Sequence, residues 1–209
     1  FNDMNNQQSF KFHAGSIGSQ TEIWWFYCSS SSSEIDRYVV WNYGEKVWYF
    51  GNLVRTTWND RASGLRSFPQ ATGTDRYLFN HEDGLDDFAT GSAVVINAFV
   101  ESSDFDIGDG QQYMLINRIL PDLSFGGSTA SNPSAKLTMR SRDFPGDDFT
   151  ESPSGTVTRT AAGPPEVYDD NIFLRARGRQ MSLRVENEAV GVKWRLGAPR
   201  LDARPDGRR

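Results

Sequence analysis

Apolar and polar side chains alternate with a period of two along much of this chain. The alternation is clearest from Lys136 onward. The alternating apolar positions are Leu137 and Met139; Ile172, Leu174 and Ala176; Met181, Leu183 and Val185; and Val192, Trp194 and Leu196. A period of two with one apolar face is typical of antiparallel strands that pack that face on a core. Because no amphipathic segment is long enough for a helix, the predicted fold class is all-β.

A denser aromatic pattern lies in residues 21–51. The run Glu22-Ile23-Trp24-Trp25-Phe26-Tyr27 and the aromatic positions of residues 37–51 fit a pleated, half-buried surface. Tyr43-Gly44-Glu45-Lys46 is expected to form a tight turn between two strands, with Gly44 supplying a positive φ. This strand–turn–strand unit is typical of propeller blades and related β assemblies.

A short motif occurs twice and suggests a repeat. Asp36-Arg37-Tyr38 and Asp75-Arg76-Tyr77 are each followed by apolar or aromatic residues and then by asparagine. A recurring strand-to-turn unit of this kind is expected in successive blades. We therefore predict partial β-propeller blades in residues 1–91. Residues 92–209 are expected to form an antiparallel, β-sandwich-like domain that completes the assembly.

Composition and charge narrow the class of protein. The chain has 209 residues, of which 37% are hydrophobic, and its one cysteine cannot form an internal disulfide. No run approaches the roughly 18 apolar residues that span a bilayer, so no membrane segment is expected. The first residue is Phe1 rather than methionine, and we expect a fragment or a processed chain.

The net charge of −5 is unevenly distributed. Eight basic and 16 acidic side chains precede Lys136, whereas 14 basic and 11 acidic side chains lie from Lys136 onward, giving net charges of −8 and +3. Such asymmetry indicates different surroundings for the two parts. Charge complementarity between subunits is one explanation, and a mildly basic surface near nucleic acid is another.

Two acidic clusters are candidates for chemistry. They are Glu82, Asp83, Asp86 and Asp87, and then Asp104, Asp106 and Asp109. The second cluster begins like a calcium loop, but its fifth, sixth and twelfth positions do not follow the required pattern. The two histidines lie far apart, and neither a zinc spacing nor a phosphate-binding loop is present. We therefore assign no metal, no cofactor and no catalytic residue, and expect that the chain is not an enzyme.

Four arginines form the remaining candidate site. Arg175, Arg177 and Arg179 share one face if their strand continues, and Arg184 follows shortly after. Three interpretations remain open: a solvated outer face, a row of salt bridges between subunits, or an electropositive face toward DNA phosphates. We retain the four residues as candidate oligomer or channel contacts.

Several motifs, in this order, resemble one protein family across nearly all of residues 21–209. They are Glu22-Ile23-Trp24-Trp25-Phe26-Tyr27, Asp36-Arg37-Tyr38-Val39-Val40-Trp41-Asn42-Tyr43, Glu101-Ser102-Ser103-Asp104-Phe105-Asp106-Ile107-Gly108-Asp109-Gly110, Arg177-Gly178-Arg179-Gln180 and Trp194-Arg195-Leu196-Gly197-Ala198-Pro199-Arg200-Leu201-Asp202. The chain is similar to the carboxyl-terminal part of the tail nozzle, or tail hub, proteins of short-tailed bacteriophages. These are also described as packaged-DNA stabilisation proteins.

This resemblance implies a structural virion protein located in a phage tail. Such proteins are built around a β-propeller and form a ring, expected to be a hexamer, below the portal and adaptor. The ring encloses a channel that holds DNA before ejection. The expected partners are therefore copies of the chain itself, the portal and adaptor assembly and other tail proteins, with DNA in non-specific proximity inside the channel. The family offers no catalytic residue to carry over, and its chains are much longer than this one.

Two other functions remain as alternatives. A receptor- or carbohydrate-binding tail protein would need exposed aromatic platforms, for which Trp24, Trp41 and Trp58 are the candidates. A polysaccharide-degrading enzyme would need paired carboxylates, such as Asp104 and Asp106.

Overall fold

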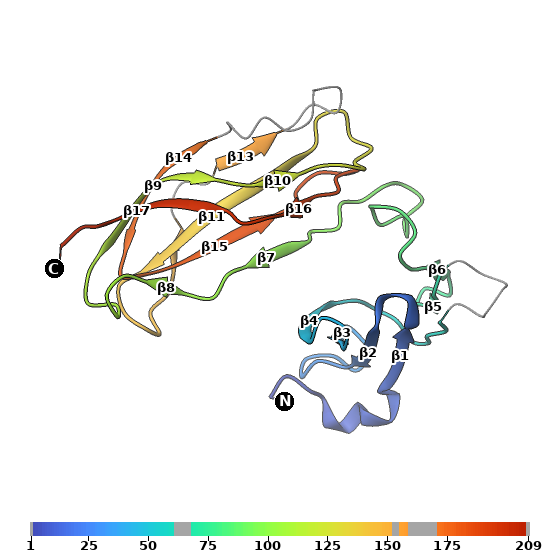
Figure 1. Cartoon of the computed structure of the whole chain (residues 1–209). Coiled ribbons are helices and arrows are strands. Elements are labelled where there is room, and N and C mark those ends of the chain that lie inside the picture. Colours follow the sequence, from blue (N-terminus) through green and yellow to red (C-terminus); the bar gives the residue numbers. More distant parts are fainter. Residues whose placement is uncertain (1, 61–67, 152–154, 159–170, 208–209) are drawn as a thin grey trace. The chain divides into compact units, whose positions relative to one another are not determined.

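The computed structural model of this chain describes residues 2–60, 68–151, 155–158 and 171–207, with the backbone alone for 155–158. It confirms an all-β fold and contains two compact units, Phe1–Gly84 and Leu85–Arg209, which we call unit 1 and unit 2 (Figure 1). The sequence pattern places the boundary between residues 91 and 92. The helical elements of the described residues are two short 3-10 segments, η1 (Asn6–Lys11) and η2 (Gly18–Gln20).

The strands follow in chain order. Those of unit 1 are β1 His13–Ile17, β2 Glu22–Tyr27, β3 Arg37–Asn42, β4 Val47–Asn52, β5 Gln70–Thr72 and β6 Leu78–Asn80. Those of unit 2 are β7 Phe99–Glu101, β8 Phe105–Asp106, β9 Met114–Leu120, β10 Leu123–Ser124, β11 Ser134–Arg142, β12 Thr150–Glu151, β13 Gly155–Thr158, β14 Ile172–Gly178, β15 Gln180–Glu186, β16 Arg195–Leu196 and β17 Arg200–Pro205.

Unit 1 is built on one antiparallel sheet of four strands in the order β1-β2-β3-β4. Its inner face carries the core, in which Trp24 and Phe26 of β2 pack with Val40 of β3. The aromatic runs of the sequence therefore form the predicted strands. Every second side chain enters the core, as the pleat requires.

A buried carboxylate ties the inner side of β4 to β2. Glu22 is buried and accepts hydrogen bonds from the Trp24 indole Nε1 at 3.0 Å and from the Tyr49 hydroxyl at 2.5 Å. These bonds offset the cost of removing the carboxylate from water. Burial, together with the hydrogen bond to Glu22, raises the pKa of Tyr49.

The turn between β3 and β4 is present at residues 43–46, but the role predicted for its glycine is wrong. The residue with a positive φ is Lys46, at 60°, and Gly44 is not among the positive-φ glycines. A Cβ at Gly44 would lie 2.5 Å from Thr21 Oγ1. Glycine is therefore needed there because a neighbouring side chain approaches closely.

The predicted repeat does not produce two similar strands. The first Asp-Arg-Tyr motif leads into β3, whereas in the second Arg76 has a φ of 67° and β6 begins only at Leu78. Within the described residues, β6 pairs with β5 alone. The described sheets are all open, so only the four-stranded sheet of unit 1 has the make-up of a single blade, and a propeller remains a proposal.

Unit 2 has two larger antiparallel sheets that share one core, as expected for a sandwich-like domain, and a small two-stranded sheet, β10-β16 (Figure 1). One sheet has the order β12-β11-β15-β7, with β13 also paired to β11 and β8 to β15. The other has the order β14-β9-β17. The core draws on β11 and β15 from the first sheet and on β9 and β14 from the second. The alternation predicted for residues 137–139, 172–176 and 181–185 is thereby confirmed.

The outer face of the β11–β15 sheet carries a continuous ladder of ion pairs. Its members are Lys136, Arg140, Arg142 and Arg184 with Glu101, Asp104, Glu151, Glu186 and Glu188. Glu101 lies at its centre. Its carboxylate oxygens are 3.1 Å from Arg140 Nη1 and 3.2 Å from Arg184 Nη1. Because each cation meets at least one carboxylate, this face is neutralised within the chain.

Gly15 of β1 provides a test of the unit 1 core. A Cβ there would overlap the indole of Trp58, which stacks on Trp24 at 5.4 Å and donates Nε1 to the Ser16 carbonyl at 3.0 Å. We expect Gly15→Ala to destabilise unit 1 by about 1–3 kcal/mol through overpacking. Urea unfolding followed by tryptophan fluorescence checks this, because five of the six tryptophans lie in unit 1.

The matched control is Gly126→Ala. Its Cβ would come no closer than 3.8 Å, to Ser124 Oγ, and should leave stability unchanged. Equal unfolding midpoints for the Gly15 variant and the unsubstituted chain would contradict this account of the core.

The ionisation of Glu101 makes the stability of unit 2 depend on pH. Burial alone would raise the pKa of Glu101, but hydrogen bonds from Arg140 and Arg184 outweigh it and lower the pKa from 4.5. Because the pKa of Glu101 is lower in the folded than in the unfolded state, its ionised carboxylate stabilises the fold at pH values above the unfolded-state pKa. This contribution is lost as the pH falls through 4.5 and below, where the carboxylate becomes protonated. We expect Glu101→Gln to reduce stability at neutral pH and to flatten the loss in acid.

Urea unfolding at a series of pH values, followed by circular dichroism, measures this effect. Glu45→Gln, in the exposed turn of unit 1, is the control and should leave the acid dependence as it is. A Glu101→Gln chain with the full original acid dependence would show that the ladder is not its source.

Candidate functional site

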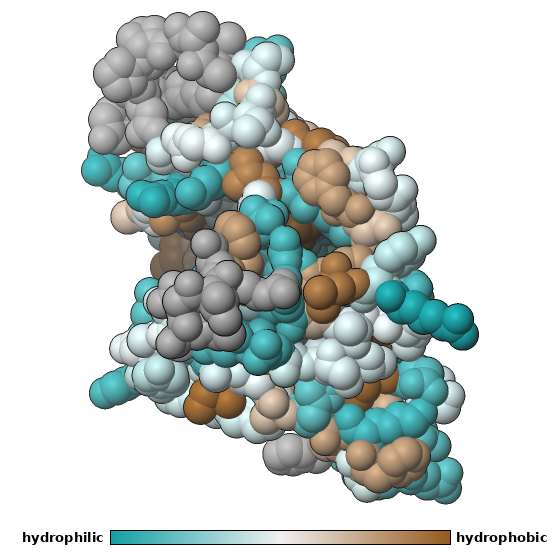
Figure 2. Space-filling model, turned by 90° about the vertical axis from the view of Figure 1, so that its right-hand side faces the viewer, coloured by the Kyte–Doolittle hydropathy of each residue, from teal (hydrophilic) through white to brown (hydrophobic). Residues whose placement is uncertain are grey.

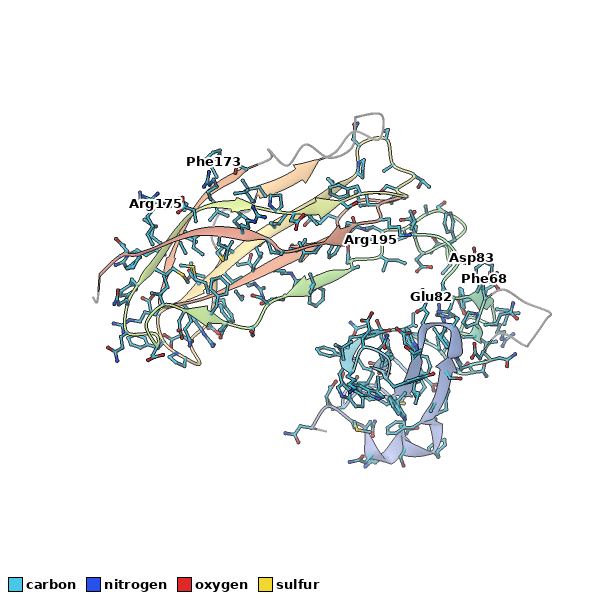
Figure 3. The ribbon with its side chains drawn as sticks, in the orientation of Figure 1. Phe68, Glu82, Asp83, Phe173, Arg175 and Arg195 are labelled. Carbon is cyan, nitrogen blue, oxygen red and sulfur yellow. The ribbon has the colours of Figure 1, made fainter. Side chains whose placement is uncertain are left out.

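The outer face of the β14-β9-β17 sheet places two of the predicted arginines side by side. Along β14, Ile172, Leu174 and Ala176 are buried, and the residues between them are exposed. Arg175 and Arg177 therefore project outward together with Phe173, whose side chain is 79% exposed. Figure 3 shows Phe173 and Arg175 pointing away from the sandwich on the same side.

The strand register brings three further arginines to this face. Arg118 of β9 lies opposite Phe173 on one side and Asp202 of β17 on the other. Leu115 of β9 likewise lies between Arg177 and Arg204. Directly opposed residues of antiparallel strands share a face. We call this surface the arginine face. Its basic members are Arg118, Arg175, Arg177, Arg200 and Arg204.

Carboxylates balance only part of this charge. Arg177 Nε donates to Asp206 at 2.6 Å, which raises the pKa of Arg177, and the guanidinium lies 4.0 Å from the Tyr113 ring centroid. Arg204 lies 3.5 Å from Asp202.

The remaining arginines of the face are less well paired within the described residues. There the side chains of Arg175 and Arg200 make no ion pair or hydrogen bond. Arg118 Nε is buried without a hydrogen-bond partner. Among the described residues, these five guanidinium groups form ion pairs with two carboxylates, Asp202 and Asp206, and Asp143 acts on Arg177 from farther away. The described part of the face therefore has a net positive charge.

The other two predicted residues are placed differently. Arg179 follows the end of β14, and its guanidinium lies 5.0 Å from the centroid of the Tyr113 ring, which Arg177 also contacts, and 5.5 Å from that of Phe144. Arg184 belongs to β15 and is held in the ion-pair ladder, 3.8 Å from the Phe99 ring centroid. Of the four predicted arginines, Arg184 is therefore the one on the other sheet.

The sequence pattern missed three members of the arginine face. Arg200, Asp202 and Arg204 alternate as on a strand, but the alternation from which strands were predicted ended at Leu196. In the structure it is β17, paired with β9 along its length. The alternation of charges was a usable signal, whereas the position of Arg118 depends on the pairing alone.

Chemically, the arginine face suits an extended anion. Guanidinium groups donate paired hydrogen bonds to phosphates and carboxylates. On neighbouring strands about 4.8 Å apart they form an array rather than a single pocket. Phe173 and Leu115 add apolar surface between the charges.

The acidic candidates are engaged in structural contacts. The Asp104 carboxylate is bound by Arg142 in the ladder, and Asp106 lies in β8. No group of three or more potential metal ligands occurs within the described ranges. His81 accepts a hydrogen bond from Arg55 Nε at 2.8 Å, and its ring centroid lies 4.7 Å from that of Trp58.

A second surface lies on the outer face of the unit 1 sheet. Of the three tryptophans proposed as platforms, Trp24 is buried and Trp58 packs against the core, so only Trp41 lies there. The register adds Trp25 and Trp48, and Trp48 stacks with Trp41 at 4.8 Å and with Trp25 at 5.8 Å. We call this surface the tryptophan face. It consists of Ile23, Trp25, Val39, Trp41, Trp48 and Phe50.

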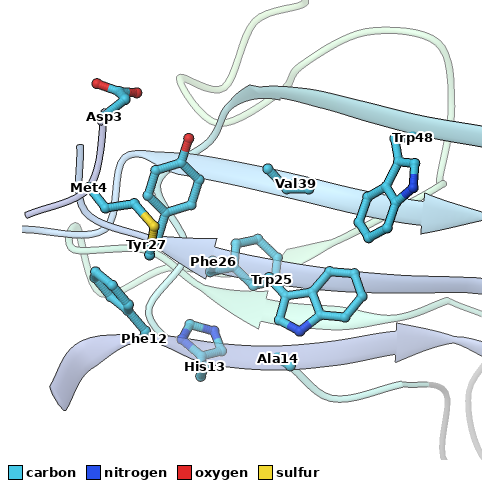
Figure 4. A pocket seen from close by; sticks show the side chains of 10 residues that line it. All are labelled: Asp3, Met4, Phe12, His13, Ala14, Trp25, Phe26, Tyr27, Val39 and Trp48. Atoms are coloured by element: carbon cyan, nitrogen blue, oxygen red, sulfur yellow. The ribbon is translucent and has the colours of Figure 1, made fainter. Parts of the chain in front are cut away.

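A hollow of about 760 Å³ opens on this face (Figure 4). Trp25 and Trp48 lie at one end, Phe12 and Tyr27 at the other, and the small side chain of Val39 between them (Figure 4). On the side of the molecule that Figure 2 shows, hydrophobic residues lie singly or in small groups among hydrophilic ones, which is normal for a protein surface. The tryptophan face gathers three stacked tryptophans on one side of a single sheet.

Within the described residues, no helix has the length and apolar character needed to cross a membrane. Comparison of the sequence with models of protein families and with curated proteins finds no match.

Proposed function

We propose that this chain is a structural protein of a short-tailed phage tail, and that its arginine face lies against DNA in the exit channel. The observation that carries the proposal is the array of five arginines on the outer face of one sheet, which in the described residues form ion pairs with two carboxylates. The family resemblance of the sequence supplies the setting: a ring of identical subunits around packaged DNA.

The distribution of pairing supports contact with DNA rather than with solvent alone. On the β11–β15 sheet, the same chain neutralises every arginine of the ladder with a carboxylate. On the arginine face, Arg175 and Arg200 lack such partners in the described residues. Contacts between cations and phosphates are independent of sequence and weaken with salt. Such contacts retain DNA and still allow it to slide.

A row of salt bridges between subunits is the competing role for the same face. Acidic residues outnumber basic ones before Lys136, so a neighbouring copy can supply carboxylates. The two roles differ in what is lost when the arginines are removed, namely DNA affinity or the oligomer.

The DNA-binding role predicts that Arg175→Gln combined with Arg200→Gln weakens binding to a short duplex of random sequence by about tenfold or more at low salt. The slope of log affinity against log salt should become shallower by about 2, one phosphate contact for each arginine. Fluorescence anisotropy across a salt series measures both quantities.

The matched control is Lys193→Gln combined with Arg195→Gln. It removes the same charge from unit 2 but lies at and beside β16, outside the arginine face. Equal weakening by both double variants would contradict a specific DNA-facing surface. Loss of the oligomer with unchanged DNA affinity would instead assign the arginines to subunit contacts.

The tail setting has its own test. Electron microscopy or native mass spectrometry of the particle that contains this chain should show a closed ring, which we expect to be a hexamer. A monodisperse monomer with turnover of a polysaccharide would contradict the structural role.

A further inference from the structure

Strand β4 is an open edge of the unit 1 sheet. It is the last strand in the order β1-β2-β3-β4, and in the described part of the chain its backbone pairs only with β3. Its sequence, Val47-Trp48-Tyr49-Phe50-Gly51-Asn52, contains neither a charged residue nor a proline. An uncharged edge with unpaired N–H and C=O groups is a template for another strand.

The edge strands β1, β14 and β17 carry features that hinder pairing with a strand of another molecule. Next to β1, the Trp58 indole lies over Gly15 and donates to the Ser16 carbonyl, and Asp60 accepts from the Gly18 N–H at 3.0 Å. β14 carries exposed arginines, and β17 carries Arg200, Arg204 and a proline. These are the devices by which proteins prevent edge-to-edge pairing. Their absence from β4 is therefore informative.

The tryptophan face extends to this open edge. Trp48 and Phe50 of β4 are 62% and 77% exposed, and Trp25 on β2 is 37% exposed. Tryptophan, phenylalanine and tyrosine are enriched at the centres of protein interfaces. The polar residues that line the hollow are few, namely Asp3, His13 and Tyr27. This lining suits an apolar protein surface better than the many hydroxyl groups of a glycan.

We propose that the β4 edge pairs with β4 of a second copy of this chain, which joins the two four-stranded sheets into one. Another strand can replace the water at these backbone groups with a ladder of hydrogen bonds, and the same uncharged strand on another copy offers both the groups and matching side chains. In antiparallel pairing about Tyr49, Trp48 of one copy lies opposite Phe50 of the other, and no charges are opposed. The contact is two-fold and isologous, so it is distinct from a head-to-tail ring contact and does not depend on the tail assignment.

The test is the mass of the purified 209-residue chain across a concentration series, by light scattering or sedimentation. The chain should dimerise, and Val47→Lys combined with Phe50→Lys should raise the dissociation constant about 100-fold, the effect of losing central interface residues. The control is Val190→Lys combined with Phe88→Lys. It adds the same charge at exposed residues of unit 2, 43% and 60% exposed against 46% and 77%, and should leave the dimer intact.

Amide hydrogen exchange gives a second readout that does not rely on substitution. In the dimer, alternate amides of β4 should become protected as the concentration rises. A chain that stays monomeric to millimolar concentration overturns the proposal, as does a dimer that survives the β4 substitutions with its edge amides unprotected. Quenching of tryptophan fluorescence by maltohexaose or chitohexaose in such a monomer would make the tryptophan face a glycan site instead. DNA affinity is measured independently, so failure of the β4 pairing leaves the arginine face untouched.

Discussion

The pleat of the β-strand is the constraint on which this structure depends. Successive side chains point to opposite faces, so a strand that buries one set of residues must present the other set outward. In unit 1 the buried set includes Trp24, Phe26 and Val40, and the outward set includes Trp25 and Trp48. In unit 2 the same rule turns Ile172, Leu174 and Ala176 inward and the arginines of β14 outward. The side chains that each unit exposes to a partner are therefore those that alternate with its core residues along the strands.

The two outer faces of unit 2 differ in charge: the face of the β11–β15 sheet is neutralised by ion pairs, and the arginine face is positive. On the β11–β15 sheet, Arg140 and Arg184 share Glu101 between them, and the pKa of that carboxyl is lowered. Exposed ion pairs of this kind add little stability one by one, although a network can add more. On the arginine face, the cations lie on strands with few carboxylates to pair with. Only the second arrangement leaves charge available for an anion.

The two proposed contacts use different physics and can operate together. The arginine face attracts a polyanion through charge, so its strength depends on salt. The β4 edge joins copies through backbone hydrogen bonds and aromatic packing, which depend little on salt. Each unit thus has its own means of association.

The sequence by itself determined the all-β class, the strands β2, β3, β4, β11, β14 and β15, and the turn at residues 43–46, because alternation and turn chemistry are local properties. It did not reveal β1 or β17, whose residues show weak apolar alternation and become strands only by pairing with β2 and β9. The arginine face was likewise only half visible. Arg175 and Arg177 share a strand, but Arg118, Arg200 and Arg204 join them through register across strands far apart in the chain. Tertiary packing also decided the burial of Trp24 and Trp58 and the close approach of Thr21 to Gly44. The local sequence does not predict these contacts, because they join residues that are far apart in the chain.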